Sequence, residues 1–354
     1  MDPNKKTQCM KRFDSDYLEG CLPQILERLT QTNLEQTPGY GEDPHCARAA
    51  SLIRRACGND NLDVHFLVVG TQANVTVISA ILRAHQGVLC ADSGHINVHE
   101  TGAVEHSGHK ALALPSPDGK ITAEQIRSAI RDHYEDFSHE HMAQPGMVYI
   151  SQPTEKGTLY SRRELENIAA ACREAHIPLF VDGARLGYGL ASPACDIRLP
   201  ELAALADVFY IGGTKQGALF GEAVVFRTRE LAKDFRYHIK QNGGMLAKGR
   251  LLGIQFEVLF EDGLYLRASR HAVEQAFRIR DAFRAKGIPF LVDSPTNQQF
   301  PILENSVIER LRADFSFESW QKVDTRRTAV RFVTSWATPD ANIDSLLSAI
   351  DTIL

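Results

Sequence analysis

The segment spanning residues 177–226 constrains the fold of this chain more than any other. It contains two short apolar runs, residues 178–181 and 208–211, each typical of a strand that is buried on both faces of a sheet. The first run is followed at once by Asp182, and the second by a glycine-rich turn that carries Lys215. Because ligands of α/β sheets bind beyond the carboxyl ends of the strands, we expect Asp182 and Lys215 to face one site.

A carboxylate and a lysine on neighbouring strand ends suit the cofactor pyridoxal phosphate. The lysine amine forms a Schiff base with the cofactor aldehyde, and the carboxylate keeps the pyridine nitrogen protonated, so that the ring accepts electrons. The alternative is that Asp182 and Lys215 are solvated loop residues or an ion pair. Flanking Lys215 are Gly212, Gly213 and Gly217. These glycines favour the cofactor site, because a surface ion pair requires no tight turn or close approach of the backbone.

The sequence resembles the threonine aldolase and β-eliminating lyase group of fold-type-I pyridoxal-phosphate enzymes. The motifs that carry the resemblance are VDGAR, residues 181–185, and GGTKQG, residues 212–217, and it extends in the right order over residues 13–347. Within this group the chain is closest to the low-specificity bacterial-type threonine aldolases. The resemblance implies an α/β fold of the fold-type-I transferase kind, with a large doubly wound, mostly parallel sheet domain and a small C-terminal α+β domain.

The order of the predicted elements agrees with this fold class. Strand–helix–strand units repeat over residues 64–226, which indicates a doubly wound sheet with right-handed crossovers. We expect an N-terminal segment at residues 1–30, a large cofactor-binding domain at residues 31–260 and a small domain at residues 261–354. Residues 289–292 are expected to form the first strand of the small domain.

A further strand end is typical of an anion site. Gly70, Thr71 and Gln72 follow a buried strand predicted at residues 64–69, and an apolar helix predicted at residues 75–84 comes next. Free backbone N–H groups and the helix dipole favour an anion at such a helix start. Taken alone, Thr71 is better explained as a helix N-cap, but the resemblance implies that the three residues together bind the cofactor phosphate. Dinucleotide and P-loop sites lack support, because no GxGxxG or Walker motif occurs.

Four histidines cluster after the next predicted strand, at positions 95, 99, 106 and 109. The resemblance implies that His95 stacks on the cofactor ring and handles protons. His99 stands where the family often has a tyrosine or another aromatic residue, which changes the aldehyde side of the pocket. The alternative is a metal site, because His95 and His99 are spaced for one helical face. Gly94 and Gly102 interrupt a long helix here and HExxH is absent, so we expect no metal.

Three residues are candidates for binding a substrate carboxylate. Arg331 alternates with apolar neighbours in AVRFVTSW, which points it to one face of a strand, and its fork of donors matches a carboxylate. The resemblance implies that Arg331, Arg185 and Ser15 hold the substrate carboxylate, and that Arg185 also contacts the cofactor. The open alternatives are a salt bridge at the sheet edge for Arg331 and a turn or helix cap for Ser15.

The resemblance, carried over to these candidates, implies cleavage of a β-hydroxy-α-amino acid, such as L-threonine or L-allo-threonine, to glycine and an aldehyde. We expect Lys215, Asp182 and His95 to be the catalytic residues, with His95 or a water that it positions as the base for the β-hydroxyl proton. One alternative is β-elimination or transamination with the same cofactor, because the protein decides which bond at Cα stands perpendicular to the ring. Another is a cofactor-binding or scaffold protein on an inherited fold.

Composition bears on partners and compartment. The formal net charge is −5 without a basic run, which argues against a nucleic-acid partner. No apolar stretch approaches the roughly 20 residues that span a bilayer, and the start of the chain lacks the apolar core of a signal peptide, so we expect no membrane partner. Seven scattered cysteines without a CxxC pair indicate reduced thiols in the cytoplasm.

An oligomer is also expected from the resemblance. It implies a homo-oligomer, a dimer or a tetramer, with the site near the subunit interface. The glycine-rich turn at residues 242–244 and a basic residue after it, Lys248 or Arg250, are then expected near a neighbouring subunit's cofactor. The alternative for both basic residues is ordinary surface charge.

Overall fold

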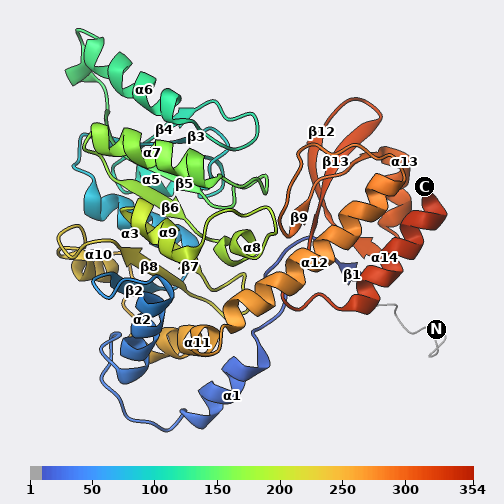
Figure 1. The fold of residues 1–354 in the computed structure, drawn as a ribbon, viewed down its shortest axis with the longest axis horizontal. Coiled ribbons are helices and arrows are strands. Elements are labelled where there is room, and N and C mark those ends of the chain that lie inside the picture. Colours follow the sequence, from blue (N-terminus) through green and yellow to red (C-terminus); the bar gives the residue numbers. More distant parts are fainter. Residues whose placement is uncertain (1–9) are drawn as a thin grey trace.

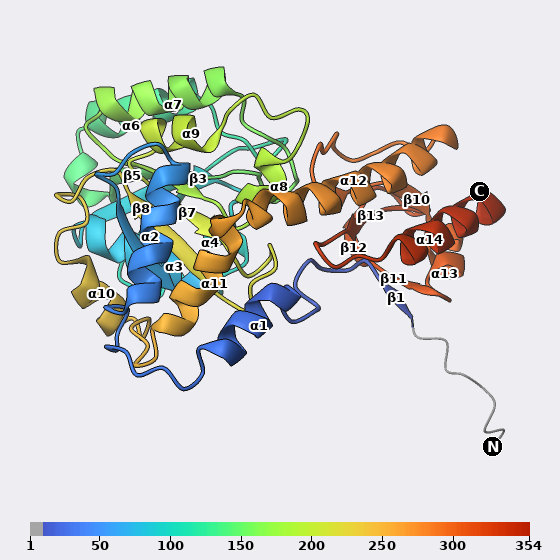
Figure 2. The ribbon, with the colours of Figure 1, turned by 60° about the horizontal axis from the view of Figure 1, so that its bottom comes forward.

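The computed structural model describes residues 10–354, so Cys9 and the first part of the predicted N-terminal segment lie outside the described residues. A large α/β body lies beside a smaller one, and the long helix α12, Leu264–Ala285, leads from the first to the second (Figures 1 and 2). Strand β1 (Lys11–Arg12) and helix α14 (Asp340–Ile353), near the two ends of the described residues, both lie at the smaller body (Figure 1). The domain boundaries expected at residues 30 and 260 stay a prediction.

The large body is built on a seven-stranded sheet with the order β2-β8-β7-β6-β5-β3-β4. Its strands are β2 (Asp63–Leu67), β3 (Gln86–Ala91), β4 (Lys110–Leu114), β5 (Gln144–Ser151), β6 (Leu179–Asp182), β7 (Val208–Gly212) and β8 (Glu222–Phe226). Strand β8 runs antiparallel to both of its neighbours, and the other neighbouring pairs are parallel. The predicted mostly parallel sheet is confirmed. The expected repeat of strand–helix–strand units is wrong between β7 and β8, because residues 213–221 form a tight turn that can only join antiparallel strands.

Helices cover both faces of this sheet. They are α1 (Pro23–Gln31), α2 (Pro44–Ala56), α3 (Gly70–Ile81), α4 (His95–Val98), α5 (Ala103–His106), α6 (Ala123–Glu135), α7 (Arg162–Glu174), α8 (Leu186–Leu190), α9 (Leu199–Leu205), α10 (Phe235–Gln241) and α11 (Arg250–Glu261). Successive strand residues point to opposite faces, so β7 contributes to two cores. Phe209 and Ile211 belong to the core that contains α7 and α11, and Val208 and Tyr210 to the core that contains α3 and α10.

The smaller body has an antiparallel sheet of its own, with the order β10-β13-β12 and with β9 also paired to β13. Its elements are β9 (Gln298–Gln299), β10 (Ile302–Glu304), β11 (Phe315–Ser316), β12 (Glu318–Lys322), β13 (Arg327–Val333), α13 (Asn305–Leu311) and α14 (Asp340–Ile353). The prediction of a strand at residues 289–292 is wrong. Only an isolated bridge between Phe290 and Pro301 forms there, since Pro289 and Pro301 both lack the N–H that a ladder needs.

The N-terminal segment is tied to the smaller body by backbone hydrogen bonds. Strand β1, Lys11–Arg12, pairs in parallel with β11. Phe13 then donates to Ser316 O over 2.7 Å and accepts from Val333 N over 2.7 Å, and its ring is fully buried in the core of α12, α14 and β13. These bonds fix the start of the segment that carries Ser15 and Asp16.

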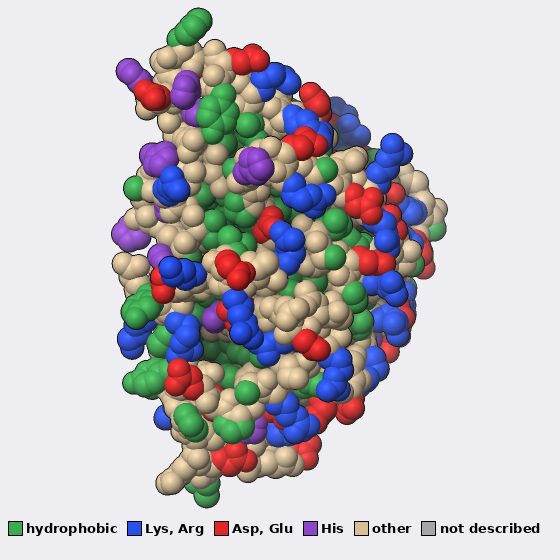
Figure 3. All heavy atoms as spheres, turned by 60° about the vertical axis from the view of Figure 1, so that its left-hand side comes forward, with side chains coloured by type: hydrophobic (Ala, Val, Ile, Leu, Met, Phe, Trp, Pro, Cys, Tyr) green, Lys and Arg blue, Asp and Glu red, His purple; other side chains and the backbone are tan. Residues whose placement is uncertain are grey.

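The face of the molecule shown in Figure 3 carries both acidic and basic side chains. On the face that Figure 3 presents, acidic and basic side chains are interspersed rather than gathered by sign. None of the helices within residues 10–354 is long and apolar enough to cross a membrane. Cys21, Cys46, Cys57, Cys90, Cys172 and Cys195 are free thiols.

Candidate active site

Loops that follow five parallel strands meet at one edge of the large sheet. Strand β2 leads to Gly70, β3 to His95, β5 to Glu155, β6 to Asp182 and β7 to Lys215. A cavity of about 350 Å³ lies among them, and its lining includes Gly70, Thr71, His95, Glu155, Asp182, Arg185 and Lys215. We call this cavity of about 350 Å³ the inner cavity. The common direction of the strands brings its lining residues together, although they lie far apart in the sequence.

A second cavity of about 580 Å³ adjoins the first and extends toward the smaller body. The two share five residues, Tyr17, His95, Glu155, Arg185 and Lys215. Ser15 and Arg331 line only the second, which we call the outer cavity. Ser15 comes from the segment that Phe13 anchors, and Arg331 comes from β13.

Among the predicted site residues, Gln72 lines neither cavity. Its side chain is used within the fold, accepting from Val68 N over 3.1 Å and donating to Asn242 O over 2.9 Å. Helix α3 begins at Gly70, five residues earlier than predicted, and Val69 occupies the N-cap position without a side-chain cap. The N-cap explanation of Thr71 is therefore wrong, and the N–H groups of the first turn are left for another acceptor.

Asp182 is a buried carboxylate that is saturated by hydrogen bonds. Tyr210 and Tyr149 donate their hydroxyls over 2.5 Å each, one to each oxygen. Ala184 N donates over 2.9 Å and Asn74 Nδ2 over 3.1 Å, so each oxygen accepts twice. Burial, and then the charge of Asp182, raise the pKa of both tyrosines well above its ordinary value, which keeps their hydroxyls as donors. The fold thus holds the Asp182 carboxylate at a fixed place in the inner cavity.

Two glycines allow β6 and β7 to deliver Asp182 and Lys215 side by side. A Cβ on Gly183 would lie 1.8 Å from Tyr210 O, a distance that no side chain tolerates. After Lys215 the chain turns at Gly217, whose φ of 99° favours glycine. Burial and the nearby charge of Arg185 lower the pKa of Lys215, and a lowered pKa leaves more of the amine in its nucleophilic neutral form.

His95 is oriented by a buried relay that leads back to Asp182. Its Nδ1 lies 2.7 Å from Glu100 Oε1, and Asn74 Nδ2 donates to the same oxygen over 2.7 Å and to Asp182. Burial lowers the pKa of His95, but the hydrogen bond to Glu100 and the charge of Asp182 outweigh this and raise it. The pKa of His95 therefore lies above its ordinary value, and Nε2 is the ring nitrogen that Glu100 does not use.

His99 lines the outer cavity with its ring centroid 5.6 Å from that of His95. Burial, and then the charge of His95, lower its pKa, so it favours the neutral form. Within residues 10–354, no group of three or more His, Cys, Asp or Glu side chains is arranged to hold a metal ion. His106 and His109 line neither of the two cavities.

Arg185 is held by a carboxylate that we did not predict. Asp16 is fully buried and accepts from Arg185 Nε over 2.7 Å and from Nη2 over 2.9 Å, and Asn297 Nδ2 donates to it over 2.9 Å. Burial opposes the charge on Asp16, but the charge and hydrogen bonds of Arg185 outweigh it and hold the pKa of Asp16 below its ordinary value. Two of the three guanidinium nitrogens of Arg185 are thus committed to positioning.

We expect Asp16→Ala to lower the free energy of unfolding by about 3–5 kcal/mol, because it leaves the buried charge of Arg185 without its partner. A folded-state pKa below the unfolded value of about 3.9 means that this stabilisation is present above pH 4 and is lost as the pH falls through the folded pKa. Urea unfolding at pH 7 and at pH 3 measures both statements. Asp14→Ala is the matched control, because the Arg12–Asp14 pair is exposed, and such pairs contribute about 0–1 kcal/mol. Equal effects of the two substitutions would contradict the expectation.

Ser15 and Arg331 present unsatisfied polar atoms at the outer cavity. Ser15 Oγ and Arg331 Nε are buried without a hydrogen-bond partner among the described residues. Arg331 donates Nη1 to Gln298 Oε1 over 3.0 Å, pairs through Nη2 with Glu318, and lies over the Trp320 ring at 5.1 Å. The sheet-edge salt bridge considered for Arg331 is thus present, and it occupies part of the donor fork. A ligand carboxylate would satisfy both orphaned atoms.

Sequence reasoning missed the groups that hold the predicted ones in place: Asp16, Asn74, Glu100, Tyr149 and Tyr210. Tyr149 and Tyr210 lie within the apolar strands β5 and β7. A hydroxyl inside a buried run normally has a partner, so both tyrosines carried a signal that we did not use. Asn74 and Glu100 carry no such signal, because only the packing of α3 against the loop after α4 brings them together.

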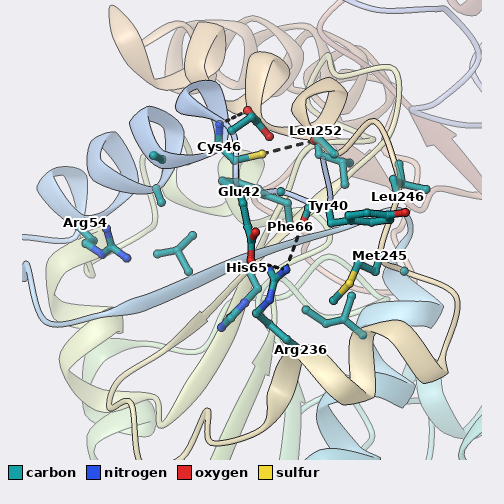
Figure 4. A pocket seen from close by; sticks show the side chains of 18 residues that line it. Tyr40, Glu42, Cys46, Arg54, His65, Phe66, Arg236, Met245, Leu246 and Leu252 are labelled. Atoms are coloured by element: carbon teal, nitrogen blue, oxygen red, sulfur yellow. Dashed lines mark hydrogen bonds and ion pairs between the residues drawn. The ribbon is translucent and has the colours of Figure 1, made fainter. Parts of the chain in front are cut away.

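A separate hollow of about 310 Å³ lies away from these residues (Figure 4). It is bounded by α2, by β2 and by the two segments around Tyr40 and Met245, and it contains none of the predicted site residues. The two segments are joined by a backbone hydrogen bond of 3.3 Å from Tyr40 N to Ala247 O. Close by, Arg250 donates to the carbonyls of Thr32, Asn33 and Glu35 after α1, so its charge is used within the chain. Lys248 is exposed.

The fold and the lysine-bearing sheet edge define the fold-type-I class of α/β enzymes. An aspartate aminotransferase of Thermus thermophilus superposes with a TM-score of 0.71 at 15% identity, covering 98% of this chain and 92% of that one, a likeness of fold alone.

The chain belongs to the beta-eliminating lyase family, whose profile matches residues 13–305. Two relatives cover nearly its whole length. The low-specificity L-threonine aldolase of a Pseudomonas species is 31% identical over 98% of this chain and 99% of its own. The structure of a threonine aldolase from Leishmania major superposes with a TM-score of 0.94 at 42% identity, covering 97% of this chain and 99% of that one.

Proposed function

We propose that this protein is a pyridoxal-phosphate-dependent aldehyde-lyase that cleaves β-hydroxy-α-amino acids, such as L-threonine and L-allo-threonine, to glycine and an aldehyde. One observation carries the proposal. An amine of lowered pKa and a saturated carboxylate, Lys215 and Asp182, line a cavity that adjoins the orphaned donors of Ser15 and Arg331. The near full-length relatives named as threonine aldolases support the choice of reaction.

The residues of the inner cavity fit pyridoxal phosphate. The uncapped start of α3 offers N–H groups at Gly70, Thr71 and Gln72 to a phosphate, so Gln72 would act through its backbone alone. Asp182 would hold the pyridine nitrogen in its protonated form, and Lys215 would hold the cofactor aldehyde. Once bound, the cofactor supplies an electron sink for negative charge at Cα.

The chain's own side chains would set which bond breaks. Arg331 and Ser15 bind the substrate carboxylate at the outer cavity, and Arg185, kept in place by Asp16, supplies positive charge between the two cavities. Holding the carboxylate would restrict rotation about the bond from nitrogen to Cα, and this restriction would select which bond at Cα is broken. Lys215 then donates a proton to Cα of the glycine fragment. His95, oriented by Glu100, lines both cavities.

The decisive experiment supplies purified protein with pyridoxal phosphate and offers L-threonine, L-allo-threonine and phenylserine in turn. We expect glycine and the matching aldehyde in equal amounts. Release of ammonia and a keto acid without glycine would instead assign β-elimination. No product from any of the three would contradict the proposed function.

We propose that the protein assembles as a dimer or tetramer with the site near a subunit interface. The exposed ring of Tyr40, held at a φ of 61° in the left-handed region, and the exposed Lys248 lie on adjoining segments, and strain of this kind is typical of functional positions. Because Arg250 is committed within the chain, Lys248 is the basic residue left to reach a neighbouring subunit's cofactor.

Sedimentation at assay concentration is expected to show a dimer or a larger species. We also expect Lys248→Ala to weaken cofactor binding by about tenfold, the effect of losing one charge-assisted hydrogen bond. Arg198→Ala, which removes an exposed pair with Glu201 at the start of α9, is the control. A monomer with full activity would contradict the assembly.

A further inference from the structure

Glu155 lines both cavities of the site and has no role in the proposed function described above. It follows β5 and lies, with His95, Arg185 and Lys215, on the wall that the inner and outer cavities share. A group on this wall faces both the space assigned to the cofactor ring and the space assigned to the substrate carboxylate. An amino acid bound across the two cavities would therefore pass this wall.

The two carboxylate oxygens of Glu155 have different surroundings. Oε1 accepts from Ser151 Oγ over 2.6 Å and from the backbone N–H of His95 over 3.0 Å. Within the described chain, no group donates a hydrogen bond to Oε2, and this oxygen is not among the buried atoms that lack a partner. Oε1 therefore fixes the carboxylate in place, and Oε2 is the oxygen available to the cavity.

Two histidines near Glu155 are alternative candidates for the base that takes the β-hydroxyl proton. His95 already pairs through Nδ1 with Glu100 over 2.7 Å, and that hydrogen bond raises its pKa, which favours a proton donor over a base at this position. His99 favours the neutral form, but it lines only the outer cavity, beside Trp320 and Arg331. Burial, followed by the charge of Asp182, raises the pKa of Glu155, which makes its carboxylate a stronger base than an exposed one.

We propose that Glu155, through Oε2, is the group that takes the proton of the substrate β-hydroxyl, an inference that rests on the proposed function. In this step the bond between oxygen and hydrogen breaks and its proton goes to Oε2. The electron pair that it leaves forms the second bond of the aldehyde carbonyl, and the Cα–Cβ bond breaks with its pair retained by the Cα fragment. Glu155 leaves the step as a neutral acid and returns the proton to solvent after the aldehyde departs.

Glu155→Gln tests this role, because the amide oxygen can still accept from Ser151 and His95 while the basic oxygen is lost. We expect kcat for L-threonine and phenylserine to fall about 100-fold or more, the usual contribution of a positioned acid–base group. Glycine has no β-hydroxyl, so the dissociation constants of glycine and of pyridoxal phosphate, followed by titration, should stay within about threefold. In Glu155→Ala, added formate should restore part of the lost rate.

His99→Asn and the surface substitution Glu124→Gln are made in parallel. Glu124→Gln should leave the rate unchanged, and His99→Asn should change the preference among aldehydes more than the rate.

Three results would overturn the proposal: a rate for Glu155→Gln within about threefold of the unaltered protein, an equal loss of glycine and cofactor binding in that variant, or a loss of about 100-fold in His99→Asn alone. If the unaltered protein forms no glycine from any β-hydroxy amino acid, the proposed function and this role fall together. An active Glu155→Gln would overturn this role alone.

Discussion

Lys215→Ala is expected to lower turnover by at least about 10³-fold, the largest effect of any single substitution in the chain. General acid–base transfer alone contributes about 10²–10⁴-fold, and Lys215 would provide both proton transfer and the covalent attachment of the cofactor. The structure supports this expectation through the lowered pKa of the amine and its place on the wall shared by both cavities. Steady-state turnover of L-threonine measures the effect.

Covalent attachment is tested separately from turnover. Borohydride reduction of the reconstituted protein should fix the cofactor on the peptide that contains Lys215, and mass spectrometry identifies that peptide. Lys156→Ala is the matched control, because Lys156 lies near the site but donates to the carbonyls of Ser116 and Pro117. Reduced cofactor on any other lysine, or a Lys215→Ala variant with unaltered turnover, would remove Lys215 from this role.

The second large effect is expected from Asp182→Asn, which keeps the shape of the side chain and removes its charge. Turnover should fall about 10²–10³-fold, the cost of losing one preorganised charged group in a buried site. The affinity for pyridoxal phosphate should fall much less, because the start of α3 and Lys215 would still hold the cofactor. Turnover and a cofactor titration by absorbance separate the two quantities.

Tyr149→Phe provides a graded comparison, since it removes one of the four hydrogen bonds to Asp182 and leaves the charge in place. Its effect on turnover should be about tenfold, the value of one hydrogen bond to a charged group. Asp136→Asn, on the exposed loop after α6, is the surface control. If Asp182→Asn retains turnover within about threefold, or loses cofactor binding as much as turnover, the carboxylate does not act on the ring.

The sequence determined much of the large body and the principal side chains of the site. The sequence predicts residues 178–181 and 208–211 as buried strands, because these apolar runs are too short for a helix and are bounded by glycine-containing turns. Parallel strands place their carboxyl ends at one edge, so the meeting of Asp182 and Lys215 was predictable from the order of elements alone. The crowding at Gly183 and the φ of Gly217 give the physical reason for those glycines.

Tertiary structure decided the partners of each group and therefore its charge state. Asp16, Asn74, Glu100 and Glu155 reach the site from segments that have no local pattern in common. Glu100 raises the pKa of His95 and is itself held by Asn74 of α3, and Arg185 is held by Asp16, which lies 169 residues away in the sequence. The antiparallel β8 also depended on a turn whose length, rather than its composition, rules out a crossover. The residues of the site could thus be predicted from their positions at the ends of strands. Their pKa shifts could not, because burial and nearby charges arise only in the folded chain.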